Sequence, residues 1–388
     1  MRTNKATRGQ VRRHNRQLLL RIIYSGLANN RAALALESGL AKPTVSALIT
    51  EFLDEGLLIE GGRGASTESG GKRPRLLEFV PDARQVIGVS IKSDQIRAVL
   101  ANLNGEPYAE HFTELNGRQG RAVITLLQEV INGLIAQLDA PLLCIGVGIS
   151  GHINSEQGIV DRAAHLGWED LRLGELLTQK YRTPVYVANS TEMAALGQYM
   201  FATPDAVNSL VMVLVNNSVG IGTVLDGARH HFGSEISHLV VPYVTSDEHT
   251  LPQSIQQRLG WQAVRESIAE QCQVYPDSML AREPVTYLLI RYAAANGDPV
   301  ALALHEELSE TLALVLAWIA TLLHPQHILV AGRIAELGES LLIQALDRME
   351  LLIAPELFAT TTFSLANASN LVAMGAVAYT LQQELGLV

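Results

Sequence analysis

The amino-terminal fold is decided by residues 38–56, which read SGLAKPTVSALITEFLDEG. Pro43 suits the first turn of a helix, where a missing backbone N–H costs nothing, and Gly56 is a natural stop. The apolar side chains between them follow the spacing of one helix face, and they are Val45, Leu48, Ile49, Phe52 and Leu53. The stretch therefore predicts an amphipathic helix that buries one face and leaves the other free.

Two shorter helical patterns precede this helix. Residues 14–24 repeat leucine and isoleucine at helical spacing, and residues 31–38 form a second helix that Gly39 closes. Two helices, a turn of about four residues and a third amphipathic helix make a helix-turn-helix, whose last helix offers its polar face to the major groove of DNA. A small helical subdomain with no DNA-binding role is the alternative.

The polar face of the predicted third helix carries small side chains. On a helical wheel Thr50 points away from the apolar stripe, Thr44 and Ser46 flank it, and Lys42 stands at the amino-terminal end. Small polar side chains can approach phosphates and base edges closely. We therefore predict that these four residues contact DNA.

A hairpin follows the third helix. Residues 57–59 and 75–80 read as two strands, and residues 61–71 between them read as a loop rich in glycine. Such a hairpin is a wing, and its basic side chains are placed for contacts to the DNA backbone or minor groove. These side chains are Arg63, Lys72, Arg73 and Arg75.

Charge is distributed unevenly along the chain. The 388 residues carry a formal net charge of −10, yet residues 1–80 hold 13 basic and 7 acidic side chains. The seven basic residues up to position 21 are Arg2, Lys5, Arg8, Arg12, Arg13, Arg16 and Arg21. A surface of this kind is expected to meet phosphates, so we predict that Arg12 and Arg13 contact DNA. A solubilising tail is the alternative.

Composition excludes several classes of protein. With 48% hydrophobic and 18% charged residues, the chain has enough apolar material for about two or three domains. No apolar run approaches the roughly 20 residues that a bilayer demands, and the amino terminus lacks the apolar stretch of a secretory signal. The two cysteines, Cys144 and Cys272, lack the spacing of a zinc site. We expect a cytoplasmic protein with no membrane segment and no disulfide framework.

From residue 84 onward, short β-branched runs alternate with longer helical patterns, which indicates α/β layers. Residues 142–149 and 185–188 read as buried strands, and Asn189 and Ser190 follow directly after the second. Ligands of α/β sheets bind in the crevice beyond such strand ends. Residues 210–214 begin a second lobe of similar strands.

Short motifs throughout the chain resemble those of the ROK family, named for repressors, open reading frames and kinases. In the amino-terminal part they are residues 14–16 (HNR), 38–46 (SGLAKPTVS), 55–58 (EGLL) and 70–74 (GGKRP). In the remainder they are residues 166–168 (LGW), 188–197 (ANSTEMAALG), 226–227 (DG), 233–238 (GSEISH) and 331–332 (AG).

The resemblance implies an α/β body with the two-lobed, actin-like fold of a sugar kinase, preceded by a winged helix-turn-helix at residues 1–80. The first lobe would comprise residues 84–205 and be completed by a carboxy-terminal helix at 372–388. The second lobe, at residues 206–371, would hold the dimerisation surface and the effector cleft.

Three departures from the family pattern argue against phosphoryl transfer. Where kinases of the family carry an Asp-x-Gly-Gly-Thr phosphate loop, this chain has Ser90 to Asp94, and the second phosphate loop reads Asn216 to Ser218. In place of the catalytic aspartate stands Ser190, whose hydroxyl is a weak base. The cysteines that bind zinc after His238 in the family are missing as well. We therefore expect no catalytic residue, no metal and no cofactor.

Part of a sugar-binding cradle remains. The resemblance assigns sugar contacts to Asn189, Glu235 and His238, places Gln253 loosely at a further sugar-binding position, and brings in Gly151 and Ser190 as neighbours. The effector would be a sugar, a sugar derivative or a different small molecule. A vestigial pocket that binds nothing is the alternative.

Together these observations predict a transcriptional regulator of the ROK type, in the form of a repressor that binds double-stranded operator DNA. Operators with two-fold symmetry place half-sites about 34–36 Å or a multiple apart, so we expect a homodimer or tetramer. An effector that prefers one lobe arrangement would change DNA affinity through a coupling of about 1–3 kcal/mol. The alternatives are an active sugar kinase with a DNA-binding head and a DNA-binding scaffold without a small-molecule effector.

Overall fold

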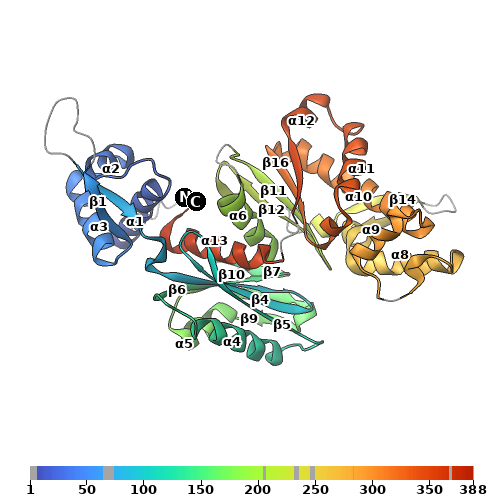
Figure 1. The fold of residues 1–388 in the computed structure, drawn as a ribbon, viewed down its shortest axis with the longest axis horizontal. Coiled ribbons are helices and arrows are strands. Elements are labelled where there is room, and N and C mark those ends of the chain that lie inside the picture. Colours follow the sequence, from blue (N-terminus) through green and yellow to red (C-terminus); the bar gives the residue numbers. More distant parts are fainter. Residues whose placement is uncertain are drawn as a thin grey trace. The chain divides into compact units, whose positions relative to one another are not determined.

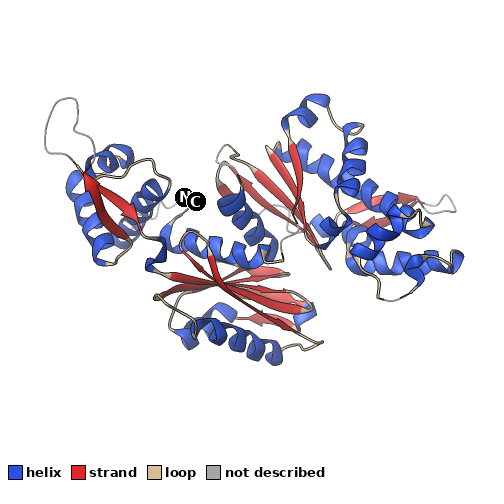
Figure 2. Cartoon of the chain, in the orientation of Figure 1, coloured by secondary structure: helices blue, strands red, loops and turns tan. Residues whose placement is uncertain are grey.

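The computed structural model describes residues 7–63, 74–203, 207–230, 236–244, 250–282, 284–366 and 369–387. The chain divides into two compact units. Unit 1 comprises Met1–Ala188 with Ala376–Val388, and unit 2 comprises Asn189–Gly375. Figures 1 and 2 show the helices and strands of both units.

Unit 1 begins with three helices and a two-stranded sheet, which together form the winged helix-turn-helix module predicted from the sequence. Its elements are α1 (Arg8–Tyr24), α2 (Arg31–Ser38), α3 (Lys42–Asp54), β1 (Leu58–Arg63) and β2 (Arg75–Phe79). Helix α1 starts six residues before the predicted residue 14 because Thr7 and Gln10 form a capping box, in which the Gln10 amide donates to the Thr7 hydroxyl over 3.3 Å.

The core of this module comes from the predicted apolar stripe. Val45, Ile49 and Phe52 on α3 have no exposed surface, and neither has Leu34 on α2. Gly39 after α2 adopts a φ of 67°, the left-handed conformation that favours glycine. The tight turn between α2 and α3 therefore depends on that glycine.

A five-stranded sheet forms the centre of the rest of unit 1. Its order is β10 (Val185–Asn189), β6 (Leu142–Ile149), β3 (Gln85–Ile91), β4 (Gln95–Asn102) and β5 (Pro107–Glu114). Helices α4 (Arg121–Ile135) and α5 (Leu173–Tyr181) cover one face, and α13 (Leu371–Leu385) lies along the other (Figure 1). A Cβ at Gly146 of β6 would come within 2.4 Å of the Ala376 carbonyl, so glycine permits this close packing of α13.

Smaller elements complete unit 1. They are η1 (Pro81–Ala83), η2 (Ala164–Leu166), and a three-stranded sheet of β7 (His152–Asn154), β8 (Ile159–Ala163) and β9 (Trp168–Leu171).

Unit 2 repeats the sheet topology of unit 1. Its five-stranded sheet has the order β13 (Ala228–His230), β12 (Val219–Leu225), β11 (Leu210–Val215), β16 (His327–Ala331) and β17 (Thr362–Ala366). In both sheets the central strand pairs antiparallel with the next strand in sequence and parallel with a later one. This duplication is the arrangement expected of a two-lobed kinase-like body.

Helices cover both faces of the second sheet. Helix α6 (Ser190–Ala202) lies on one face, where a Cβ at Gly222 would come within 2.3 Å of the Thr191 carbonyl. The long helix α10 (Pro299–Leu323) shares a buried core with Val213 and Val215 on the opposite face. The remaining elements are β14 (Val240–Val244), β15 (Thr250–Ser254), α7 (Ile255–Leu259), α8 (Trp261–Val274), α9 (Tyr287–Ala295), α11 (Glu339–Glu350), α12 (Pro355–Thr360), η3 (Ile236–His238), η4 (Met279–Ala281) and η5 (Arg333–Leu337).

Candidate DNA and effector sites

The amino-terminal half of α3 presents polar side chains outward. Lys42 is exposed, and Thr44 and Ser46 are half-buried at the edge of the apolar stripe. Within the ranges that the structure describes, none of these three side chains has a hydrogen-bond or ion-pair partner. Ala41 offers no side-chain cap, so the positive end of the helix dipole faces outward together with Lys42. This end of α3 is therefore suited to an anionic partner.

The other end of α3 is acidic and is bound to α1. Glu51 accepts a hydrogen bond from Arg12 over 2.7 Å, and Arg16 pairs with both Glu51 and Glu55. The Arg16 guanidinium also lies 4.6 Å from the centre of the Phe52 ring. Arg12, a predicted DNA contact, is thus already paired inside the module.

Arg13, the other predicted contact on α1, lies at the carboxy-terminal segment of the chain. Its guanidinium donates to the Gln383 carbonyl over 2.8 Å. Thr50, on α3, donates its hydroxyl to the Ser46 carbonyl one turn earlier, over 2.9 Å.

The wing is described only in part. Arg75 on β2 pairs with Glu60 on β1, and Arg31 of α2 approaches the same carboxylate at 3.8 Å. Lys72 and Arg73 lie outside the described residues, and so does the side chain of Arg63.

Asn189, a predicted effector contact, caps α6. Its side-chain oxygen accepts hydrogen bonds from the backbone amides of Thr191 and Glu192, over 2.8 and 3.4 Å. The next residue, Ser190, is buried with 4% of its surface exposed. The structure therefore brings these two predicted residues together at the start of one helix, where Asn189 has a structural role as well.

Sequence reasoning missed a buried ion pair beside this cap. Glu192 of α6 pairs with Arg229 of β13, and their side chains are 7% and 11% exposed. The available signal was an acidic residue in the first turn of a helix, directly before residues 193–197, which have no polar side chain.

The other predicted effector residues are spread over both units. His238 is exposed on η3, and Gln253 is half-buried on β15. Gly151 belongs to unit 1, where its φ of 142° and the Arg162 carbonyl, 2.4 Å from a built Cβ, require glycine. Glu235 lies outside the described residues.

The turn between β11 and β12, predicted as a degenerate phosphate loop, is held by amide side chains. The Asn216 side chain accepts from the Arg333 amide over 3.0 Å. Gln256 donates to the Asn217 carbonyl over 2.7 Å and accepts from the Val219 amide over 3.0 Å. Amide side chains of the protein itself thus form hydrogen bonds with the backbone in and beside this turn.

The corresponding turn of unit 1 joins β3 to β4. Its backbone closes through a hydrogen bond from the Lys92 amide to the Gln95 carbonyl over 2.9 Å. Ser90, which begins the stretch predicted to replace the family's first phosphate loop, is 2% exposed, and its hydroxyl has no partner in the described part of the chain.

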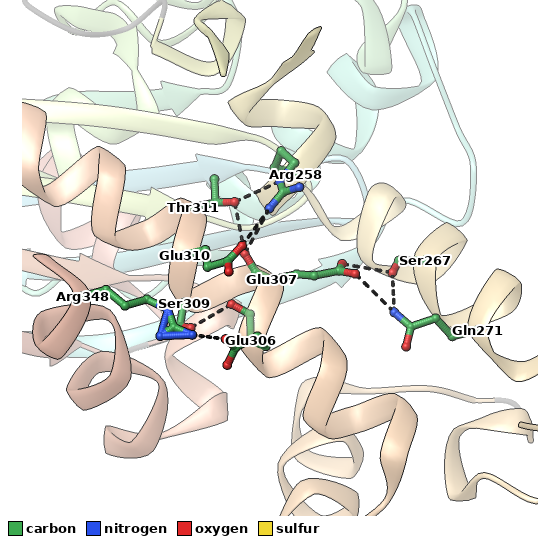
Figure 3. A network of polar contacts seen from close by, with 9 residues as sticks. All are labelled: Arg258, Ser267, Gln271, Glu306, Glu307, Ser309, Glu310, Thr311 and Arg348. Carbon is green, nitrogen blue, oxygen red and sulfur yellow. Dashed lines mark hydrogen bonds and ion pairs between the residues drawn. The ribbon is translucent and has the colours of Figure 1, made fainter. Parts of the chain in front are cut away.

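A polar network connects α10 to α7, α8 and α11 of unit 2 (Figure 3). Arg258 of α7 donates to the Thr311 hydroxyl over 3.0 Å, and Glu307 accepts from Ser267 of α8 over 3.3 Å. Burial raises the pKa of Glu307, while the Arg258 charge opposes the rise. The network fastens α7 and α8 to α10.

The described residues contain no group of three or more histidine, cysteine, aspartate and glutamate side chains placed to hold a metal ion. None of their helices has the length and apolar character needed to cross a membrane.

Comparison with known proteins gives a matching family profile and several similar proteins. The ROK family profile matches residues 86–382. The chain is 25% identical over 338 residues to the xylose repressor of Caldicellulosiruptor bescii, covering 84% of each protein. It is 28% identical over 240 residues to the xylose repressor of Bacillus subtilis, of which it spans 62%.

Solved structures confirm the predicted fold. A ROK family transcriptional regulator, described as a homolog of the Escherichia coli MLC protein, matches 97% of this chain and 98% of its own, with a TM-score of 0.81 and 22% identity. A ROK family glucokinase from Streptomyces griseus matches 77% of this chain and 99% of its own, with a TM-score of 0.61 and 19% identity.

Proposed function

The chain belongs to the ROK family, and from that premise we propose that it is a sugar-responsive transcriptional regulator that represses by binding operator DNA. The observation that carries the proposal is that Lys42, Thr44 and Ser46 of α3 face outward with no partner among the described residues, in a chain that is similar to a xylose repressor over 84% of its length. Such a regulator works where the DNA is, in the cytoplasm.

In this proposal α3 enters the major groove. Thr44 and Ser46 are placed to read base edges, while Lys42 neutralises a phosphate at the positive end of the helix. The wing residues Arg63, Lys72, Arg73 and Arg75 contact the DNA backbone or the minor groove, as predicted from the sequence. Two copies of the module are needed for a two-fold operator, so the working form is a homodimer or a tetramer of this chain.

The body, with the predicted lobes 84–205 and 206–371, binds an effector and transfers no phosphate. Ser190 replaces the aspartate that would take the proton of a sugar hydroxyl, and Ser90 offers a hydroxyl where Mg²⁺ requires a carboxylate. In addition, the Asn216 side chain already fills the turn that would cradle a nucleotide phosphate.

The effector site would use Asn189, Ser190, Glu235, His238 and Gln253 of unit 2. A sugar that prefers one arrangement of the body shifts the population of DNA-binding heads toward or away from the operator-competent form. Xylose is the first probe, because two similar proteins are xylose repressors.

Selection from random duplexes, followed by titration with and without xylose, tests the proposal. We expect a selected duplex to bind at least about 10³-fold tighter than a scrambled one at physiological salt. A coupled assay for ATP consumption with xylose or glucose is run in parallel. Turnover that Asn189→Ala abolishes would favour the second candidate, an active sugar kinase, which the likeness to the glucokinase fold raises.

A further inference from the structure

One carboxylate of the DNA-binding module holds two arginines that come from different elements. Glu60 of β1 pairs with Arg75 of β2, and Arg31, the first residue of α2, approaches the same carboxylate at 3.8 Å. Neither guanidinium pairs with another carboxylate among the residues that the structure describes. We call Arg31, Glu60 and Arg75 the Glu60 cluster. Its two positive charges and one negative charge leave a net charge of +1.

The backbone of the module brings the three side chains together. Glu60 lies opposite Leu77 in the β1–β2 register, so its side chain leaves the sheet on the face of that buried leucine. The Leu77 amide donates to the Asn29 carbonyl over 2.7 Å, which fixes β2 to the loop before α2. Asn30 then caps α2 through its side chain. Arg31 therefore begins its helix beside the strands that carry the other two members of the cluster.

The charges of the Glu60 cluster are exposed unequally. The side chain of Arg75 is 68% exposed and that of Arg31 is 39% exposed, whereas that of Glu60 is 28% exposed. A molecule that approaches this surface meets the guanidinium groups more than the carboxylate. Each guanidinium has five N–H donors in a planar fork, and one shared carboxylate cannot accept all ten hydrogen bonds. The cluster therefore suits a further anion with several acceptor oxygens.

A second ion-paired group in the module has no such excess charge. Arg12 and Arg16 of α1 pair with Glu51 and Glu55 of α3, so two positive charges meet two negative charges. The attraction of a group of exposed charges for a distant anion follows the net charge of the group. Of these two ion-paired groups, the one at the start of α2 and the base of the wing is therefore the one that attracts an anion.

We propose that the Glu60 cluster binds a phosphate of the DNA backbone, with Arg31 and Arg75 as the contacts and Glu60 as a positioning residue that also limits non-specific affinity. The identity of the partner rests on the proposed function. The first helix of a helix-turn-helix crosses the DNA backbone while the second reads the groove, which brings the start of α2 to the phosphates. Because Glu60 cancels one of the two positive charges, the cluster releases about one counterion where two free arginines would release about two.

The test measures the slope of log K against log salt for full-length variants on the selected and the scrambled duplex. R31A removes the excess charge of the cluster, so we expect the slope to fall by about 0.9. E60Q adds one positive charge to the cluster, so we expect the slope to rise by about 0.9 and both duplexes to bind more tightly. The R31A/E60Q double variant has the net charge of the original cluster and should return to the slope of the wild type.

Two matched variants separate this site from a general effect of charge. Glu78 of β2 is exposed and lies opposite Ile59 in the register, on the other face of the sheet from Glu60, so E78Q adds the same charge outside the cluster. Arg121 is exposed on α4 of the body, so R121A removes the same charge as R31A from another part of the chain. We expect both to keep the slope of the wild type. Thermal unfolding should be nearly the same for all variants, because exposed ion pairs contribute little to stability.

An R31A slope equal to that of the wild type would overturn the phosphate site, and an E60Q slope that rises no more than that of E78Q would overturn the role of Glu60. If R31A does not fold, Arg31→Gln carries the same measurement. If the wild type binds both duplexes equally, the proposed operator recognition fails, while the slopes on the scrambled duplex still decide whether the cluster binds phosphate. Absence of binding to either duplex would overturn both.

Discussion

The DNA-binding module and the body use polar side chains in opposite ways. In the module, Lys42, Thr44 and Ser46 face outward without a partner among the described residues. In the body, polar side chains are bound internally, as Asn216 after β11 is to the Arg333 amide and Glu192 of α6 is to Arg229. Residue type alone therefore does not separate the two groups. Side chains with internal partners support the fold, whereas those without such partners are available to bind another molecule.

The largest loss of thermal stability is expected when the buried ion pair between Glu192 and Arg229 is broken. Arg229→Met leaves the Glu192 charge buried without its partner, which costs about 3–5 kcal/mol. Thermal unfolding of unit 2 should therefore occur about 10 °C lower, since 1 kcal/mol shifts the midpoint of a domain this size by roughly 2–4 °C. Differential scanning calorimetry makes the measurement. A shift below about 2 °C would show that the pair is worth no more than a surface ion pair.

Removing the Thr44 and Ser46 hydroxyls should change DNA recognition and leave the stability of the protein nearly unchanged. T44A/S46A removes two hydroxyls that lack internal partners, so the melting temperature should stay within about 2 °C of wild type. Preference for the selected duplex over a scrambled one should fall by about 30-fold or more, because each of the two base contacts is worth about 1–3 kcal/mol. Fluorescence anisotropy with both duplexes checks this, and equal losses on the two would place these residues away from the bases.

The Lys42→Ala variant tests whether this side chain contacts a DNA phosphate. Losing one phosphate contact should lower the salt slope by about 0.9 and weaken binding to selected and scrambled duplexes alike. Titrations between about 50 and 200 mM salt give the slope. A drop confined to the selected duplex would mean that Lys42 reads a base.

The smallest change in stability is expected at the partly buried carboxylate of Glu307. The raised pKa of Glu307 means that the folded state disfavours its charged form, so this group destabilises the protein as pH rises through the unfolded and then the folded pKa. Glu307→Gln should therefore leave the free energy of unfolding unchanged below the unfolded pKa and increase it slightly at neutral pH. Urea unfolding at pH 4 and pH 7.5 tests the sign, and a loss at pH 7.5 would show that the charge is favourable.

Local patterns in the sequence predicted the module well. The α3 stripe, the Gly39 turn and the wing strands depend on contacts between near neighbours, which periodicity and turn residues report. The start of α1 was predicted at residue 14 and lies at Arg8, because the Thr7 capping box extends the helix. The body's fold came from motif resemblance, and the repeated sheet order confirms it.

Contacts between distant residues were out of reach. Arg13 was assigned to DNA by its charge, but its observed partner, Gln383, lies 370 positions away. The Glu192 and Arg229 pair spans 37 positions and leaves no periodic trace. Asn189 was predicted as a sugar contact. Asn189 followed by Glu192 also has the spacing of a helix cap, and the structure shows Asn189 capping α6.

Equilibrium titration of the full-length protein with the selected and the scrambled duplex at about 0.15 M salt decides whether the protein recognises an operator sequence. We expect a dissociation constant of about 10⁻⁸ M or lower for the selected duplex and binding weaker by at least about 10³-fold for the scrambled one. Equal affinity for the two duplexes would contradict the claim that this chain reads an operator.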